Sequence, residues 1–136
     1  MAESLFSRDL APFLFYTSYR SNSRQQQMFH MLTCFNLKPE ITLDEIRQSL
    51  AEFTEHMKQV DLVHSTGPIG RRQRDTIMDT DSERDHDYFF ITSFRDRAQC
   101  DRAVEYILPH EEPGESRHTA VYSKVRDQIF ICWEDV

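Results

Sequence analysis

Between residues 28 and 60 the hydrophobic and polar positions follow two patterns in succession. Residues 28–37, MFHMLTCFNL, are mostly apolar or aromatic, and a run of this length is typical of a buried β-strand. Pro39 donates no backbone hydrogen bond and disfavours the helical conformation at the residue before it, so the strand should end there. Thr42 and Glu45 have the spacing of a capping box, which predicts a helix that begins at residue 43.

Within this unit the spacing of the apolar residues assigns a buried side to each element. In the helix they recur at intervals of three and four: Leu43, Ile46, Leu50, Phe53, Met57 and Val60. His56 lies off this stripe and is expected to face solvent. In the strand, alternation places the larger, more apolar residues beneath the helices: Phe29, Met31, Thr33, Phe35 and Leu37. The smaller, partly polar set should face away from the helices: His30, Leu32, Cys34 and Asn36.

The rest of the chain predicts further strands and helices, and their order along the sequence indicates the fold. Residues 61–66 predict a second strand that Gly67-Pro68-Ile69-Gly70 breaks, and residues 71–87 form a polar connection. Residues 88–94, YFFITSF, are aromatic and β-branched and predict a third strand. Asp96 with Gln99 predicts the start of a second helix, followed by a short helix at 116–125 and a final strand at 128–133. The order β-α-β-β-α-β predicts an α+β, ferredoxin-like fold with the helices on one face of the sheet.

Helices on one face leave the other face of the sheet uncovered. A large exposed apolar face is not tolerated in a monomer, so the pattern predicts a homodimer packed sheet against sheet as a dimeric α/β barrel. We expect residues 28–136 to form this domain and residues 1–27 to be an N-terminal extension and linker.

Composition narrows the classes of function. The 136 residues predict one domain, and 23 acidic against 16 basic residues give a net charge of −7, which argues against a nucleic-acid partner. No apolar run approaches the ~20 residues that a membrane span needs, so no membrane partner is expected. The three cysteines are an odd number in apolar or helical segments, which predicts reduced thiols in a cytoplasmic protein.

Cofactor and metal motifs are not evident in the sequence. With three glycines the chain has no glycine-rich phosphate loop, and its histidines and cysteines lack metal-site spacing, so neither a cofactor nor a metal is predicted. Asp79, Asp81 and Glu83 suggest a calcium loop, but Arg84 stands where that loop requires glycine.

The segment FHMLTCFNLKPEITLDEI resembles the opening of the stress-responsive dimeric α/β-barrel (Dabb) proteins. The glycine turn at 67–70, YFFITSFRDRAQCDRAVEYI, and the end of the chain with His118 and QIFICW are also similar to that family. The resemblance covers residues 28–136. The chain differs in its extension, in its long 71–87 connection, and in the spread of the usual close histidine pair into His110 and His118.

The resemblance implies candidate catalytic residues. Plant polyketide cyclases of this family use a first-strand histidine, a tyrosine late in the second helix and a histidine just after it. The matching positions here are His30, Tyr106 and His118, with His110 as the alternative to His118. A neutral imidazole can remove a proton next to a carbonyl, and a tyrosine hydroxyl can donate to the oxyanion that develops. The competing interpretation is that His30 and Tyr106 are interior packing residues.

Two hypotheses of function follow. In the first, the barrel interior binds a small apolar or aromatic molecule, with cofactor-independent cyclase or monooxygenase-like chemistry. Its walls would then include Leu32, Cys34, Asn36, Phe90 and Trp133. In the second, the protein is a non-catalytic, stress-responsive dimerisation domain whose sheet face serves assembly alone.

Overall fold

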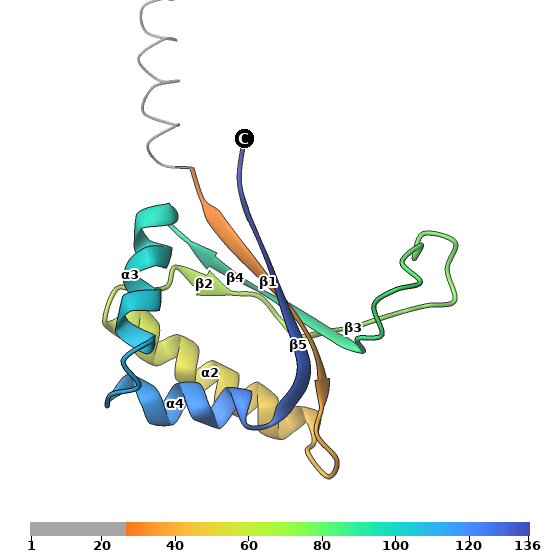
Figure 1. Ribbon diagram of the computed structural model, residues 1–136, viewed down its shortest axis with the longest axis horizontal. Helices are drawn as coiled ribbons and strands as arrows, with labels where there is room; N and C mark the ends of the chain where they lie inside the picture. Colours follow the sequence, from red (N-terminus) through yellow and green to blue (C-terminus); the bar gives the residue numbers. More distant parts are fainter. Residues whose placement is uncertain (1–26) are drawn as a thin grey trace, which may run out of the picture.

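The computed structural model describes residues 27–136, so the predicted extension lies, apart from its last residue, outside the described part. One sheet and three helices make up this domain (Figure 1). The elements in chain order are β1 (Phe29–Leu37), α2 (Leu43–Gln59), β2 (Ser65–Thr66), β3 (Gly70–Arg71), β4 (Tyr88–Phe94), α3 (Arg97–Ile107), α4 (Gly114–Tyr122) and β5 (Val125–Glu134).

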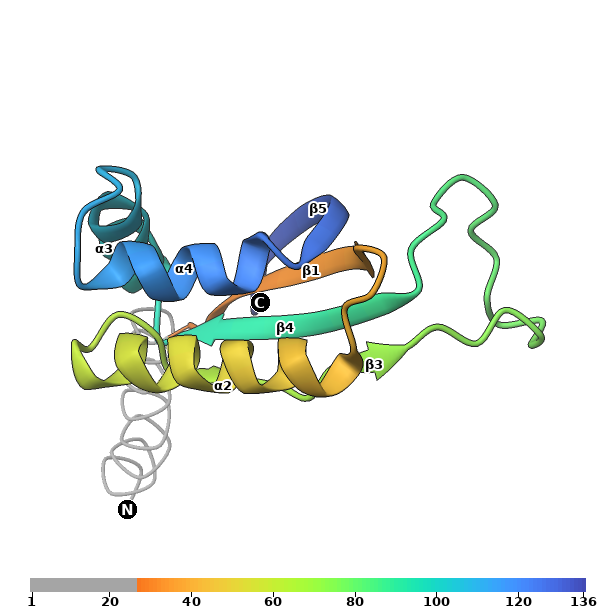
Figure 2. The same ribbon diagram turned by 90° about the horizontal axis from the view of Figure 1, so that it is seen from below.

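The sheet is antiparallel, with strand order β2-β4-β1-β5, and β3 also pairs with β4. All three helices lie on one side of it, with α2 and α4 side by side (Figure 2). This arrangement confirms the predicted α+β, ferredoxin-like fold.

Three predicted boundaries differ from the structure. The expected strand at 61–66 is reduced to β2, because Asp61 adopts a φ of 59° and donates its N–H to Lys58 in the turn that ends α2. The short helix begins at Gly114 instead of residue 116 and ends at Tyr122. β5 begins at Val125, three residues before the predicted start, because its first residues pair with the end of β1.

The start of α2 confirms the predicted capping box. The Glu45 N–H donates to Thr42 Oγ1 at 3.2 Å, and the Thr42 N–H donates to Glu45 Oε2 at 2.6 Å. Such a cap stabilises a helix by about 1 kcal/mol. Ile46, Leu50 and Met57 are buried as the apolar stripe predicts. The prediction for Val60 is wrong: it is the C-cap residue, beyond the last turn of α2, and is exposed. The prediction for His56 is wrong: it is buried, and its Nε2 lies 2.8 Å from the Tyr106 hydroxyl of α3.

The predicted faces of β1 are confirmed. Phe35 packs with Ile46 and Phe90 in one core cluster, and Phe29 and Met31 pack against a second cluster beneath α2 and α3. The expectation that Phe90 fills the other face is corrected by the register: Phe90 pairs with Thr33 and therefore points toward the helices.

The opposite face of the sheet carries a band of apolar side chains from three adjacent strands. We call this band the open-face stripe: Leu32, Phe89, Ile91, Ile129, Ile131 and Trp133. Ile91, Ile129, Ile131 and Trp133 are exposed in the single chain. No helix of the described residues covers them (Figure 1).

All three cysteines are free thiols. Cys34 and Cys100 are buried, whereas Cys132 is exposed. Cys132 pairs with Met31 and so lies on the helix side, while Cys34 lies on the open side, which keeps their sulfur atoms apart although β1 and β5 are neighbours. None of the helices in residues 27–136 is long and apolar enough to cross a membrane.

Candidate functional site

A cavity of about 400 Å³ lies between the helices and the sheet. Its walls are mostly aliphatic and aromatic side chains from every layer of the domain: Met31, Leu50, Phe53, Met57, Val63, Phe90, Phe94, Cys100, Ala103, Val104, Ile107, Leu108 and Phe130. Fewer polar groups reach it: Thr54, Thr66, Thr92, His110, His118, Tyr122 and Gln128. An apolar pocket with a few polar groups is the usual form of a small-molecule site.

His118 and Tyr122 are two aromatic side chains with polar groups that lie together on the wall of this cavity, and we call them the polar pair. They stand four residues apart on α4, their ring centroids are 4.7 Å apart, and His118 also packs against Phe53 of α2 at 5.7 Å. Burial lowers the pKa of His118, so its imidazole is neutral at pH 7. Burial raises the pKa of Tyr122 to about 12, so its phenol keeps its proton.

Two further polar features adjoin this pair. The Thr33 hydroxyl offsets part of the rise in the pKa of Tyr122. This hydroxyl is buried and has no hydrogen-bond partner of good geometry within residues 27–136. His110, also on the cavity wall, holds Glu115 Oε2 at 2.9 Å. This contact lowers the pKa of the Glu115 carboxyl. His110 is therefore engaged with a carboxylate, while His118 contacts aromatic rings.

The structure divides the predicted site residues between two places. His118 and Phe90 line the cavity on the helix side. The others that alternation places on the open face remain there: His30, Leu32, Cys34, Asn36 and Trp133. A ligand site on that face would need a second sheet opposite it, and it stays a prediction. The β1 residue that does reach the cavity is Met31.

On the open face, His30 is held by three neighbours. Its Nδ1 lies 2.8 Å from Ser93 Oγ, its Nε2 lies 3.0 Å from Asp135 Oδ1, and its ring is 5.3 Å from that of Trp133. These contacts join β1 to β4 and to the end of the chain. They are those of a hydrogen-bonded structural histidine.

Tyr106 is likewise engaged in packing. Its hydroxyl contacts His56 of α2, and its ring lies against Gly114 at the start of α4. A Cβ at Gly114 would lie only 2.6 Å from Tyr106 Cε1, so this position requires glycine. Tyr106 therefore positions α2, α3 and α4 relative to one another instead of lining the cavity.

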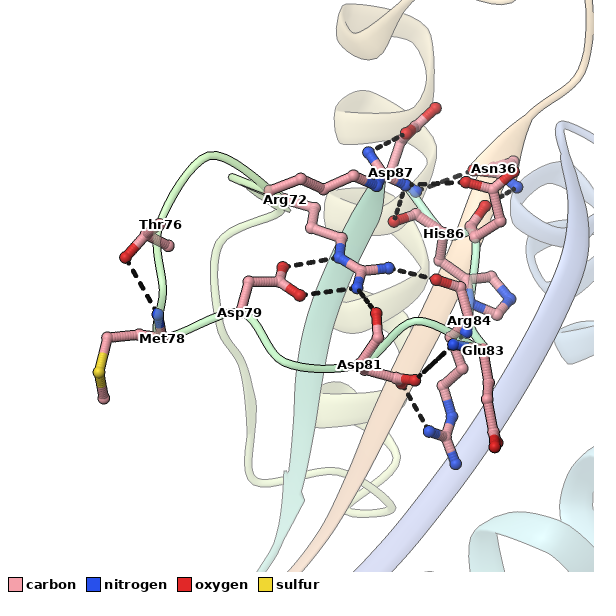
Figure 3. A network of polar contacts seen from close by, with 12 residues as sticks. Asn36, Arg72, Thr76, Met78, Asp79, Asp81, Glu83, Arg84, His86 and Asp87 are labelled. Atoms are coloured by element: carbon pink, nitrogen blue, oxygen red, sulfur yellow. Dashed lines mark hydrogen bonds and ion pairs between the residues drawn. The ribbon is translucent and has the colours of Figure 1, made fainter.

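Asn36 makes hydrogen bonds within the domain that the sequence did not suggest. Its Nδ2 donates to the Asp85 carbonyl at 2.9 Å and to Asp127 Oδ2 at 3.2 Å. Its Oδ1 accepts from the Asp87 N–H at 2.8 Å (Figure 3). His86 Nε2 adds a contact of 2.6 Å to the Asp127 carbonyl. The end of the 71–87 connection is thus fixed against β1 and β5.

Asp79 and Asp81, which suggested a calcium loop, face arginines in the structure. Asp79 pairs with Arg72 at 2.8 Å and Asp81 pairs with Arg84 at 2.6 Å. The Arg84 contact lowers the pKa of Asp81 to about 2. Within residues 27–136 no group of three His, Cys, Asp or Glu side chains is arranged to hold a metal ion.

Sequence reasoning missed Tyr122 as a site residue. A signal was present, because His118 and Tyr122 are separated by four residues and so share one face of a helix. Only the packing of α4 on the sheet shows that this face points into a cavity.

We expect the two buried histidines to make the protein less stable as the pH falls from 7 to 5. Burial lowers the pKa of both His56 and His118 below the value of about 6.5 for an unfolded histidine, so the unfolded chain binds their protons first. The stability is full above pH 6.5 and is lost as the pH falls through the two folded pKa values. Urea midpoints at pH 7, 6 and 5 measure this loss.

The control for this effect is the His56→Gln/His118→Gln double variant, whose urea midpoint should change less over the same interval. The salt-bridged carboxylates, whose pKa values are lowered, titrate in a more acidic window. An equally steep pH dependence in the double variant would contradict the assignment.

Comparison with solved structures identifies the fold. No protein-family model and no curated protein matches the sequence. SnoaB, a cofactor-independent oxygenase from Streptomyces nogalater, is similar with a TM-score of 0.54 and 11% identity, over 78% of this chain and 90% of that chain. A Dabb family protein with a ferredoxin-like fold from Mesorhizobium loti gives 0.52 and 16%, over 82% and 99%. A dimeric ferredoxin-like protein of unknown function from Thermobifida fusca gives 0.51 and 10%, over 80% and 92%.

The chain therefore has the ferredoxin-like fold found in the Dabb family and in dimeric ferredoxin-like proteins, as the sequence resemblance predicts. This chain combines that fold with an apolar cavity that His118 and Tyr122 of α4 line and with a 71–87 connection anchored to Asn36.

Proposed function

We propose that this protein is a homodimer that binds a small apolar or aromatic molecule in the cavity between the helices and the sheet. The cavity carries the proposal: about 400 Å³, with mostly apolar walls and a few polar side chains. The homodimer is supported by the open-face stripe and by the description of similar folds as dimeric. The ligand site differs from the barrel interior that the sequence suggested.

The polar pair suits acid–base chemistry without a cofactor. A neutral His118 can accept a proton from a carbon next to a carbonyl, and a protonated Tyr122 can donate to the oxyanion that develops. The apolar walls exclude water and strengthen both interactions. Such chemistry is compatible with a cyclase or an oxygenase, and SnoaB of similar fold is described as a cofactor-independent oxygenase.

The alternative is a non-catalytic dimerisation domain. The open-face stripe favours it, because assembly alone would account for that surface. Ligand binding separates the two functions, since a domain that serves only assembly has no use for the cavity.

Filling the cavity tests the proposal. Ala103 of α3 is buried on the cavity wall, so Ala103→Phe should weaken binding of a neutral aromatic probe, 2-naphthol, at least tenfold. Fluorescence titration measures the affinity. Ala98→Phe is the matched control, because Ala98 is exposed on the same helix and should bind the probe as the wild type does. Equal affinity in Ala103→Phe, or no binding of 2-naphthol by the wild type, would contradict the proposal.

A further inference from the structure

The connection between β3 and β4 is a projection that hydrogen bonds of its own residues hold together, and we call it the arm (residues 72–87). Arg72 holds it closed with a side chain that is only 8% exposed. Its Nε and one terminal nitrogen donate to the two Asp79 carboxylate oxygens, both at 2.8 Å. The guanidinium also donates to the backbone carbonyls of Asp81, at 2.6 Å, and of Arg84 (Figure 3). One buried arginine thus ties three points of the arm together.

The arm stands at the open face of the sheet. Asn36 points to that face and binds Asp85 and Asp87 at the end of the arm. Cys34, on the same face, is only 2% exposed, and the charges of Arg72, Arg84 and Asp81 all act on its thiol. From this base the arm projects beyond β3 and away from the helices (Figure 1).

The tip of the arm presents two apolar side chains to solvent. Residues 76–79 form a turn in which the Asp79 N–H donates to the Thr76 carbonyl at 3.1 Å and the Met78 N–H donates to Thr76 Oγ1 at 3.2 Å. Ile77 and Met78 occupy its centre and are 93% and 83% exposed. Turn geometry favours glycine, proline, asparagine, aspartate or serine there. The apolar pair serves neither the turn nor the core of its own chain.

The exposure of the open-face stripe favours a second apolar contact beside it. The four exposed residues of the stripe are each only 38–41% exposed, whereas a stable interface buries about 800 Å² on each partner. Ile77 and Met78 at the tip, 93% and 83% exposed, present a larger fraction of their surface on a support that Arg72 holds in place. A preorganised contact loses little conformational entropy on binding, so its apolar area contributes efficiently.

We propose that the arm is a clasp that packs Ile77 and Met78 against a second copy of this chain, beside the open sheet face. This inference rests on the homodimer of the proposed function. The second copy is the occupant because the arm is anchored at the open sheet face and projects away from the helices, which places its exposed apolar tip beside the stripe. Arg72 is then a positioning residue for the interface.

Sedimentation equilibrium tests the clasp. The Ile77→Ser/Met78→Ser variant should raise the dimer dissociation constant at least tenfold, about 1.4 kcal/mol, with the thermal unfolding of the domain otherwise preserved. Arg72→Gln should act in the same direction because it releases the tip. Val60→Ser is the control, since Val60 is exposed at the end of α2, outside the cavity wall, and should leave the constant unchanged.

The outcomes separate the two proposals. A monomeric wild type would overturn both the homodimer and the clasp. A dimeric wild type whose dissociation constant is unaffected by Ile77→Ser/Met78→Ser would overturn the clasp alone, provided that a substitution in the open-face stripe still weakens the dimer.

Photo-crosslinking locates the tip directly. With p-benzoylphenylalanine in place of Ile77, irradiation of the purified protein should give a product of twice the 16.2 kDa chain mass. Peptide mapping should place the crosslink on a second copy. Crosslinks within one chain only, or in lysate to a different protein only, would overturn the assignment.

Discussion

Replacing Ile131 by glutamate should convert the protein to a monomer. Ile131 lies opposite Leu32 in the open-face stripe and is 41% exposed in the single chain. In a sheet-against-sheet dimer both copies would bury an unpaired carboxylate, and an uncompensated buried charge costs about 3–5 kcal/mol. We therefore expect the dimer dissociation constant to rise more than ~100-fold. Sedimentation velocity at micromolar concentration measures the change.

A control variant tests whether the loss of the dimer depends on where the charge is placed or on the added charge alone. Val60 has nearly the same exposure, 40%, but is the C-cap residue of α2 and so lies outside the sheet. Val60→Glu should remain a dimer. Circular dichroism should show folded secondary structure in both variants. A dimeric, folded Ile131→Glu protein would rule out the sheet face as the interface.

Removing the Asn36 side chain should destabilise the domain and release the arm. Asn36→Ala loses three hydrogen bonds in a position that is nearly buried, and it leaves the Asp87 N–H and the Asp85 carbonyl without this partner. Such losses cost about 1 kcal/mol per bond, with a further desolvation penalty, so we expect about 2–4 kcal/mol. Urea unfolding measures the stability. Trypsin cleavage within the arm, which contains three arginines, measures the release.

An exposed amide provides the comparison. Gln48 on α2 makes one contact of 3.3 Å to Glu52, so Gln48→Ala should change stability by less than ~0.5 kcal/mol and leave trypsin cleavage unchanged. Wild-type stability and trypsin resistance in Asn36→Ala would contradict the role of Asn36 in holding the arm.

The cavity, the sheet face and the arm are related through one feature of the fold. All three helices cover the same side of the sheet, so a cavity forms beneath them and the opposite side remains available for assembly. Under the proposed function, ligand binding and dimerisation would use different faces and could be altered separately. Ala103→Phe should affect the first, and Ile131→Glu should affect the second.

The sequence by itself determined the elements whose signals are local. The Thr42–Glu45 cap and the stripe of α2 depend on residues three and four apart, and the faces of β1 follow from strict alternation. The element order then limited the topology to the ferredoxin-like arrangement. Each inference used neighbours in the chain or a rule that applies to every sheet.

Only the tertiary structure decided which polar residues serve the cavity. His56 and Tyr106 meet across 50 positions, and this contact places an expected surface histidine in the interior and holds Tyr106, a predicted catalytic residue, between the helices. Phe90 faces the helices because the register of β4 pairs it with Thr33, which alternation within β4 alone does not determine. The strand and helix periods give each residue a face, but the neighbouring elements determine what that face meets.

The arm shows the same difference between what the sequence predicts and what only the tertiary structure decides. Its composition predicts a polar connection, yet Asn36 joins it to β1 and β5 through contacts 49 to 91 residues apart, and Arg72 closes it around backbone carbonyls. Backbone carbonyls are present at every residue, so no sequence pattern marks the ones that a buried arginine will bind. The position of Ile77 and Met78 follows from these long-range contacts, and for that reason only the folded chain shows that both side chains are exposed at the tip of the arm.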